Sequence, residues 1–449
     1  MKRFKTPTIE IEDSHGVIVR QELPFRIGVI GNFSSDHSTA FNELPFRDRP
    51  FQKINLADHE RFYDLDGSEP TVANPRLAAS WQGVQQLIMS SSLGSSIEIY
   101  VLDCRESEFC ELVLEGEEYD ECKLWRKVYY DQMLLEAGIP LDIIIIDFEF
   151  THAPRDIEML SRLGSIGKDA SCLFVTSASS QLLQRDDWRL LAEIKDIQKI
   201  FSTDDYSGWN DFRKTDESRY VAMIVPRVAA SENCWISGAF YFVDEIIKLF
   251  NLSHWFFTSR DGYDSESPYN LRSHCVTEIQ IDGRKENELQ NCGLLPICSD
   301  YTSFEQWFHG AKTMQRPRLY ESRDVIETAK ANQAADLASR IPFVLASSRF
   351  VRYLYEIARG LTNTHHERNE FEQRFEAWLK QYVSGQRDTE DTDGSIQILF
   401  EASFRCSPIP GRPGVDQMIL GIWPVLPSQQ LPCPVRVCSR LPQRQYYSC

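Results

Sequence analysis

Four consecutive isoleucines, Ile143–Ile146, form the centre of the segment LDIIIIDFEF, residues 141–150. A strand made from such a run has no polar face, so both of its sides must be buried. Strands buried on both sides occur in sheets that are covered by helices on each face. The run therefore predicts an α/β fold with a buried sheet at its centre.

Helical and strand-like segments alternate around this run. Apolar residues at helical spacing begin at Arg76 and predict a helix that contains Trp81 and Val84. Further helices are expected at residues 123–137 and 237–250. Short apolar segments predict strands at residues 22–33, 96–104, 171–179, 219–227, 278–281 and 294–299. We therefore expect an α/β fold in which a mixed sheet is flanked by helices.

The last part of the chain has a different pattern. Apolar residues with helical periodicity predict two long helices, one around Phe350 and one around Phe375. Residues 395–404 and 415–426 are expected to form two strands joined by the Pro/Gly-rich segment 405–414, and the tail after Pro427 shows no periodicity. These patterns predict three parts: an N-terminal part at 1–72, a core at 73–386 and C-terminal linkage strands with a loose tail at 387–449.

The segment NDFRKTDESRYVAMIVPR, residues 210–227, combines a charged block with an apolar strand. Acidic and basic residues are nearly balanced in the block, since Asp211, Asp216 and Glu217 lie among Arg213, Lys214 and Arg219. No histidine, glycine loop or pair of metal ligands accompanies them. We interpret the block as an ionic surface loop that leads into a central strand and faces a neighbouring molecule.

One alternative is an α/β enzyme that uses Asp147 and Glu149. These two carboxylates follow the isoleucine run, and active sites of α/β proteins often lie at the carboxyl ends of strands. Other catalytic signals are missing, because the sequence contains no G-x-S-x-G motif and no H-x-x-x-H motif. We therefore expect no catalytic residues.

Cofactor and metal sites are not expected either. Gly28 and Gly31 follow a predicted strand, but neither the dinucleotide-binding nor the P-loop pattern is complete. None of the 12 cysteines forms a C-x-x-C pair, the usual basis of a structural zinc site. The cysteines are expected to be reduced thiols, mostly buried.

The charge of the chain bears on its partners. A formal net charge of −18 disfavours binding to nucleic acid, which requires clustered lysine and arginine. The N-terminus has no apolar segment of the signal-peptide kind, and no stretch is long enough to span a membrane. We therefore expect a cytoplasmic protein that does not insert into membranes.

Specific motifs in the chain resemble the large subunit of the type VI secretion contractile sheath. The most specific match is WNDFRKTDESRYVAMIVPR, residues 209–227, and it includes Trp209, Phe212, Arg213, Asp216 and Arg219 together with Pro226 and Arg227. Further similar segments follow in order: WISGAFYFVDEI, VTEIQIDGRKENELQNCGLLPI, IPFVLASSRFVRYLYEIARG and GRPGVDQMILGIWP. The resemblance covers residues 74–426 approximately.

Residues 22–65, which include ELPFRIGVIGNF, are similar to the start of the small sheath subunit, a separate chain in that family. The helical second half of the small subunit and the long N-terminal helical arm of the large subunit are absent from the sequence. In the family these helices build the outer domain through which an unfoldase recycles the sheath, so the resemblance does not imply recycling here.

The resemblance implies a structural protomer that polymerises into a helical tube and contracts without chemical catalysis. Its implied partners are copies of itself, an inner-tube protein, baseplate proteins and a separate small sheath subunit. By the resemblance we expect the N-terminal arm to pair with C-terminal edge strands at 396–404 and 416–425, with Met418, Leu420 and Ile422 at the interface. A non-polymerising baseplate or cap component with the same fold is the other alternative.

Overall fold

A computed structural model of the chain describes most of the 449 residues. The described residues are 4–12, 18–33, 44–55, 75–93, 96–134, 138–231, 234–256, 275–299, 306–308, 311–321, 323–361, 368–384, 396–408, 416–424 and 435–440. Most of the predicted connections at residues 360–369, 384–394 and 405–414 lie outside them.

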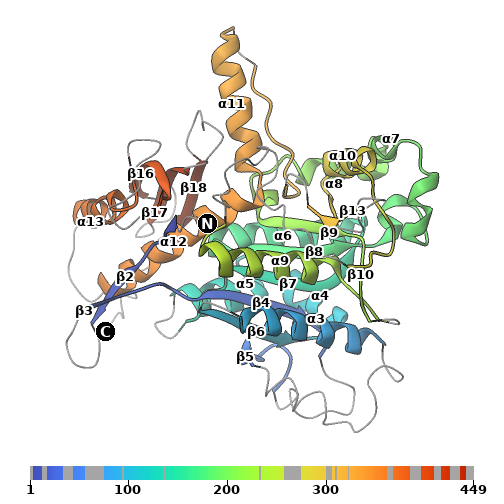
Figure 1. Cartoon of the computed structure of the whole chain (residues 1–449), viewed down its shortest axis with the longest axis horizontal. Coiled ribbons are helices and arrows are strands. Elements are labelled where there is room, and N and C mark those ends of the chain that lie inside the picture. The colour runs from blue at the N-terminus through green and yellow to red at the C-terminus, as the bar shows by residue number, and fades with distance from the viewer. Residues whose placement is uncertain are drawn as a thin grey trace.

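A seven-stranded mixed sheet forms the centre of the molecule (Figure 1). Its spatial order is β12-β9-β8-β7-β4-β6-β5, and only β5 is antiparallel to its neighbour. The strands are β4 (Phe25–Gly31), β5 (Gln52–Ile54), β6 (Ile97–Asp103), β7 (Ile143–Phe150), β8 (Leu173–Ala178), β9 (Val221–Val225) and β12 (Leu295–Pro296). The predicted α/β class is confirmed, and all four isoleucines of β7 are fully buried.

Helices cover both faces of this sheet, as its apolar strands require. In Figure 1, α3 (Pro75–Ser91) and α9 (Gly238–Ser253) lie in front and pack against each other. A Cβ atom at Gly83 of α3 would come within 2.6 Å of the Phe240 ring on α9, so the close crossing requires glycine. The opposite face is covered by α4 (Glu106–Leu114), α5 (Lys123–Trp125), the π-helix η1 (Arg126–Leu134) and α6 (Pro154–Ala170).

The strand β4 comes from the N-terminal segment, yet it lies between β7 and β6 in the middle of the sheet. The Asp142 carboxylate accepts a hydrogen bond from the Arg26 backbone N–H at 2.8 Å, where β4 begins. At its other end the Asp103 carboxylate accepts one from the Phe33 backbone N–H at 2.8 Å. The expected N-terminal part at residues 1–72 therefore shares its core with the residues that follow.

Two sequence-based strand predictions need correction. Residues 294–299 were expected to form a central strand, but β12 is a two-residue edge strand, and β13 (Cys298–Ser299) pairs with β14 (Gln306–Trp307). Pro296 explains the edge position, because proline has no N–H to donate to a further strand. The strand expected at 278–281 is absent from the described residues there, where Thr277 makes a single bridge with Val228.

The C-terminal part is built on α12 (Ile341–Leu361) and α13 (Arg368–Lys380). The expected hairpin is confirmed as β16 (Leu399–Pro408) and β17 (Asp416–Pro424). The tail was expected to be loose, and this prediction is wrong: β18 (Val435–Arg440) pairs with β17 and completes a three-stranded sheet. Backbone pairing with β17 orders this segment without help from an alternating apolar pattern.

The N-terminal arm lies against this C-terminal part. Strand β1 (Phe4–Lys5) pairs in parallel with β15 (Ile396–Gln397), and β2 (Ile9–Glu12) forms a hairpin with β3 (Ile18–Gln21). The Trp378 indole N–H donates to the Thr8 carbonyl at 2.9 Å, and the Thr8 N–H donates to the Tyr382 hydroxyl at 3.0 Å. The two ends of the chain are thus joined in one region, at the left of Figure 1.

The remaining elements are short or peripheral. β10 (Val228–Ser231) and β11 (Cys234–Ile236) form a hairpin before α9. The helices are η2 (Ser180–Leu183), η3 (Trp188–Glu193), α7 (Ile197–Phe201), η4 (Asp204–Tyr206), α8 (Ser207–Phe212), η5 (Glu217–Tyr220), α10 (Gly283–Asn291) and α11 (Val325–Ala338). Among these, α11 stands out from the body of the molecule at the top of Figure 1.

A charged cluster near the sheet edge predicts a pH dependence of stability. Burial raises the pKa of the Glu98 carboxyl, but hydrogen bonds from Lys53, Arg26 and Tyr100 outweigh it and lower the pKa to about 2. A depressed pKa means that Glu98 stabilises the fold above pH 4.5 and loses this contribution as the pH falls toward 2. We expect the stability difference between the wild type and Glu98→Gln, measured by chemical unfolding, to be largest at pH 7 and smaller at pH 3. A difference that is equal at both values would contradict this assignment.

Candidate functional site

The segment 209–227 was the main candidate for a functional surface, and much of it is internal. Trp209 at the end of α8 is fully buried, and its indole N–H donates to the Cys292 carbonyl at 3.0 Å. Phe212 is buried in the same core. These two aromatic residues therefore join α8 to the loop after α10 and act as a structural signature.

Arg213 was expected on the surface, and this expectation is wrong. Its guanidinium is buried, where Nε donates to the Met314 carbonyl at 3.0 Å. A Cβ atom at Gly293 would lie 2.5 Å from that Nε, and Gly293 has a φ of +90°. Burial lowers the pKa of Arg213 to about 10, which leaves it charged at neutral pH. A long side chain can bury its charge when backbone carbonyls accept its hydrogen bonds, which is the physical reason for the error.

The charge pairs of the segment also differ from those expected. Within it, Lys214 binds Asp211 at 2.8 Å, as predicted. Glu217 instead binds Lys168 of α6 at 2.7 Å, and Asp216 binds Arg318 at 3.3 Å. The interpretation of a locally neutralised ionic loop is thus wrong for these two carboxylates, because folding brings cations from elsewhere beside them.

Arg219 and Arg227 lie at the two ends of β9 and are half-buried. The Arg219 Nε donates to the Gln315 side-chain carbonyl at 3.1 Å. Arg227 forms a salt bridge of 2.6 Å with Glu278, and this hydrogen bond raises the pKa of Arg227. Pro226 is buried, since a Cβ atom at Gly238 would lie 2.5 Å from its carbonyl oxygen. A role of these residues between protomers stays a prediction.

The C-terminal strand residues are internal as well. Met418, Leu420 and Ile422 alternate along β17 and are buried, and β17 contacts α12. β17 was expected at an edge, but it has β16 on one side and β18 on the other, so that expectation is wrong. The edges of this sheet are β16 and β18.

A buried ionic cluster joins the N-terminal segment to α12. Asp142 lies 3.1 Å from Arg352 and 3.6 Å from Arg349, and all three side chains are buried. Arg349 also donates to the carbonyls of Leu23 and Pro24, just before β4. Sequence analysis did not single out this cluster, although two arginines three residues apart in an apolar helix were a signal for it.

The residues of the enzyme alternative do not form a recognisable site. The Ser80 hydroxyl donates to Asp147, while Glu149 is exposed. Two surface pockets, one beside Trp125 and one beside Phe51 and Leu141, include neither carboxylate. Among the described residues no cluster of three or more His, Cys, Asp or Glu side chains could hold a metal ion. No described helix has the length and apolarity needed to cross a membrane.

Comparison with known proteins places the chain in a class. Residues 73–233 match the family model described as EvpB/VC_A0108, tail sheath N-terminal domain. Residues 330–441 match that of the EvpB/VC_A0108 tail sheath gpW/gp25-like domain. The two matched segments together make up more than half of the chain. They define it as a tail-sheath protein, as the motifs around Trp209 indicated.

A curated relative agrees with this class. The chain is 26% identical over 407 residues to the type VI secretion system sheath protein TssC1 of Pseudomonas aeruginosa PAO1, covering 82% of this chain and 80% of the relative. The chain belongs to the sheath-protein family of type VI secretion systems.

Solved sheath structures are also similar to the chain. One is the contracted sheath complex of an extracellular contractile injection system, PVC, with a TM-score of 0.47 and 10% identity over 94% of this chain and 97% of that one. Another is the sheath tail protein Lin1278 from Listeria innocua, with a TM-score of 0.43 and 7% identity over 95% and 96% of the two chains.

Proposed function

We propose that the chain is a structural protomer that polymerises into a helical sheath around an inner tube and contracts without a chemical step. The observation that carries the proposal is the match of both sheath domain models on one chain. A sheath protomer must remain rigid while its interfaces rearrange. The continuous core, in which one hydrophobic cluster extends from Phe25 to Val437, suits that requirement.

The margins of this core support linkage between copies. β16 and β18 are edge strands, and β1 makes only a two-residue pairing with β15. The β2–β3 hairpin presents Ile18 and Val19 to solvent. A strand added to the sheet edge of a neighbour forms main-chain hydrogen bonds that do not depend on side-chain identity. Exchange of the N-terminal arm between copies would therefore link protomers through the C-terminal part.

The proposed partners are further copies of the chain, an inner-tube protein and baseplate proteins, and assembly is proposed to take place in the cytoplasm. A separate small sheath subunit is a further proposed partner. The position of β4 bears on this partner, because the family model begins at residue 73 and this strand lies before it. The chain itself thus provides a central strand that the matched domain does not include.

Assembly of the purified chain tests the function. We expect tubes or stacked rings in negative-stain electron microscopy, and sedimentation of the protein above a threshold concentration. A heterologous contact that does not close into a ring gives a helical tube of this kind. A monodisperse particle at high concentration would instead favour the non-polymerising baseplate or cap component.

A further inference from the structure

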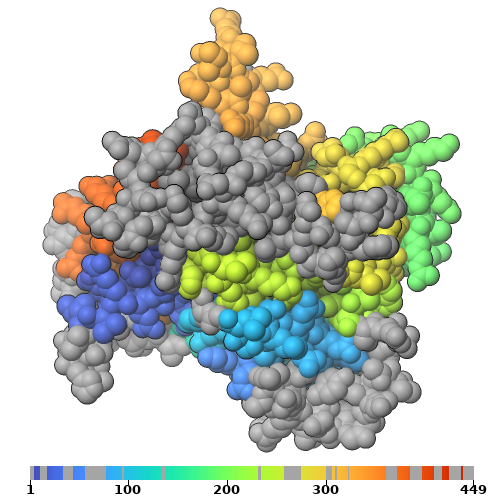
Figure 2. All heavy atoms as spheres, in the orientation of Figure 1, coloured from blue at the N-terminus to red at the C-terminus, as the bar shows by residue number. Residues whose placement is uncertain are grey.

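The helix α11 and the segment before it form an arm that extends from the body of the molecule (Figures 1 and 2). With 14 residues, α11 is about 21 Å long. Its base is anchored, since Asp336 binds Arg340 at 2.9 Å and Lys312 at 3.1 Å. Leu337 and Ala338 are buried there, whereas residues 323–327 at the outer end are all exposed.

The outer end of this arm presents apolar side chains to solvent. Leu319 is 77% exposed, Tyr320 47%, Val325 78% and Ile326 68%. The segment before the helix is held in place, because the Tyr320 N–H donates to the Asn332 side chain at 2.7 Å and Asn332 donates back to the Tyr320 carbonyl at 3.2 Å. Four apolar side chains gathered on a fixed protrusion are typical of a surface that binds another protein.

The same end carries cations in a strongly acidic chain. Arg316, Arg318, Arg323 and Lys330 are exposed there, while the net charge of the chain is −18. Of the nearby acids, Asp324 caps the helix by accepting from the N–H groups of Ile326 and Glu327. An apolar tip surrounded by cations fits an acidic surface that contains an apolar hollow.

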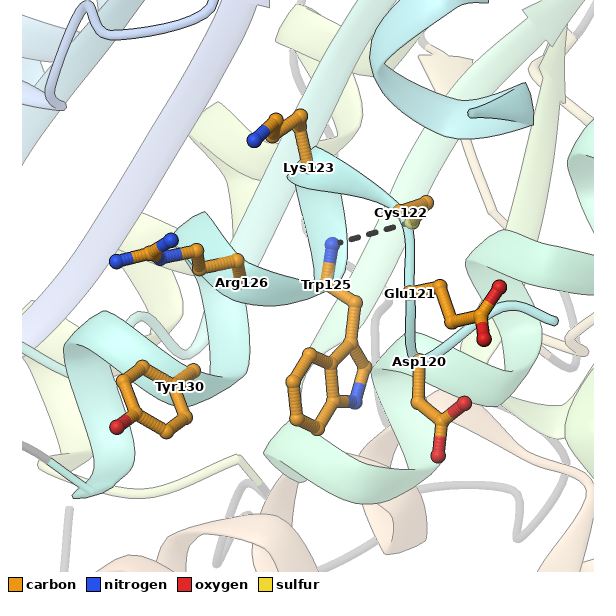
Figure 3. A pocket seen from close by; sticks show the side chains of 7 residues that line it. All are labelled: Asp120, Glu121, Cys122, Lys123, Trp125, Arg126 and Tyr130. Carbon is orange, nitrogen blue, oxygen red and sulfur yellow. Dashed lines mark hydrogen bonds between the residues drawn. The ribbon is translucent and has the colours of Figure 1, made fainter. Parts of the chain in front are cut away.

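The chain itself has such a surface, on the face of the sheet covered by α4, α5 and α6. A pocket of about 320 Å³ is lined by Trp125 and Tyr130 together with charged side chains (Figure 3). These charged side chains are Asp120, Glu121, Lys123 and Arg126. In Figure 3 the Trp125 indole separates Asp120 and Glu121 from Arg126 and Tyr130.

An acidic turn borders this pocket. Glu117, Glu118 and Glu121 are exposed, and Arg162 holds the turn by donating to the carbonyls of Gly116 and Glu117 at 3.2 Å. The Glu121 carboxylate accepts from the Glu117 N–H at 3.1 Å. The pocket thus has an aromatic wall and a fixed acidic rim, the complement of an apolar and cationic tip.

We propose that the tip of α11 docks into the Trp125–Tyr130 pocket of a second copy of this chain. The two surfaces differ, so the contact is heterologous and leaves each copy with one free tip and one free pocket. Such a contact propagates along a polymer instead of closing into a two-fold dimer. The inference rests on the proposed function, for which it specifies one of the surfaces that join protomers.

Charge reversal on the full-length chain tests the contact. We expect Arg323→Glu/Lys330→Glu and Glu117→Lys/Glu118→Lys each to raise the threshold concentration for sedimentation roughly tenfold, because unlike charges become like charges. A chain with all four substitutions should return to near the wild-type threshold, since the reversed tip then meets a reversed rim. Leu319→Asp/Val325→Asp should raise the threshold in the same way.

Matched controls separate this contact from general effects. Leu93→Asp changes an apolar side chain that is 82% exposed elsewhere, and Arg284→Glu reverses a side chain that is 81% exposed on α10. Both should assemble like the wild type, and all variants should retain the wild-type melting temperature. A wild-type chain that never sediments would contradict the proposed function. Tip variants that assemble normally, or reversals that are not restored in the fourfold variant, would overturn the docking of the tip in the pocket.

Discussion

A chain that lacks residues 1–33 is expected not to fold. The deletion removes β4 from the middle of the sheet and leaves β6 and β7 with unpaired edges. Phe25, Ile27, Val29 and Ile30 are fully buried, and burial of each such side chain contributes about 1.5–3 kcal/mol. Their sum of about 6–12 kcal/mol is comparable to the entire stability of a typical protein.

Solubility after expression and the cooperativity of thermal unfolding measure this effect. The matched control is a deletion of residues 1–21, which removes β1–β3 and keeps β4. This shorter deletion should yield a soluble protein with a cooperative transition. Residues 1–72 supplied as a separate polypeptide should restore part of the solubility of the longer deletion. A soluble, cooperatively folded chain without residues 1–33 would refute the central role of β4.

The substitution Asp142→Ala is expected to lower the free energy of unfolding by about 3–5 kcal/mol, the usual effect of removing one partner from a buried ion pair. Arg349 and Arg352 would remain buried without their carboxylate. Burial lowers the pKa of Arg352 to about 10, so the guanidinium stays charged at neutral pH. The Arg26 N–H would lose its acceptor as well.

Chemical unfolding of the purified variants checks this prediction. The double substitution Asp142→Ala/Arg352→Met removes one of the two buried cations, so it should be more stable than Asp142→Ala alone. Lys214→Ala provides the surface control, because its ion pair with Asp211 is exposed and such pairs contribute about 0–1 kcal/mol. A loss below about 1 kcal/mol for Asp142→Ala would show that the cluster is not a determinant of stability.

Sequence patterns predicted the elements of the core well, because these elements have strong local signals. The isoleucine run became β7, and the apolar residues around Trp81 became α3. Predictions failed where the signal was not local. β18 has no alternating pattern of its own and is ordered by pairing with β17, and β12 lies at an edge rather than at the centre.

The candidate surface was predicted less well for a related reason. Sequence motifs identified Trp209, Phe212 and Arg213, but a motif does not show whether its residues face solvent or the core. The structure buries all three, and it brings Arg318 beside Asp216 and Lys168 beside Glu217 from distant parts of the chain. The protruding tip of α11 has weak amphipathic character, so no periodicity marked it as a separate surface.

The sequence by itself determined the α/β class and the sheath family, since both depend on local patterns and on motifs in a fixed order. Only the tertiary structure decided that β4 lies between β7 and β6, that Arg213 is internal and that α11 extends into solvent. The physical reason is that burial and strand order depend on contacts between residues far apart in the chain. Hydrophobic burial favours any arrangement that covers the apolar strands, and the specific pairing of backbone and buried charges selects one.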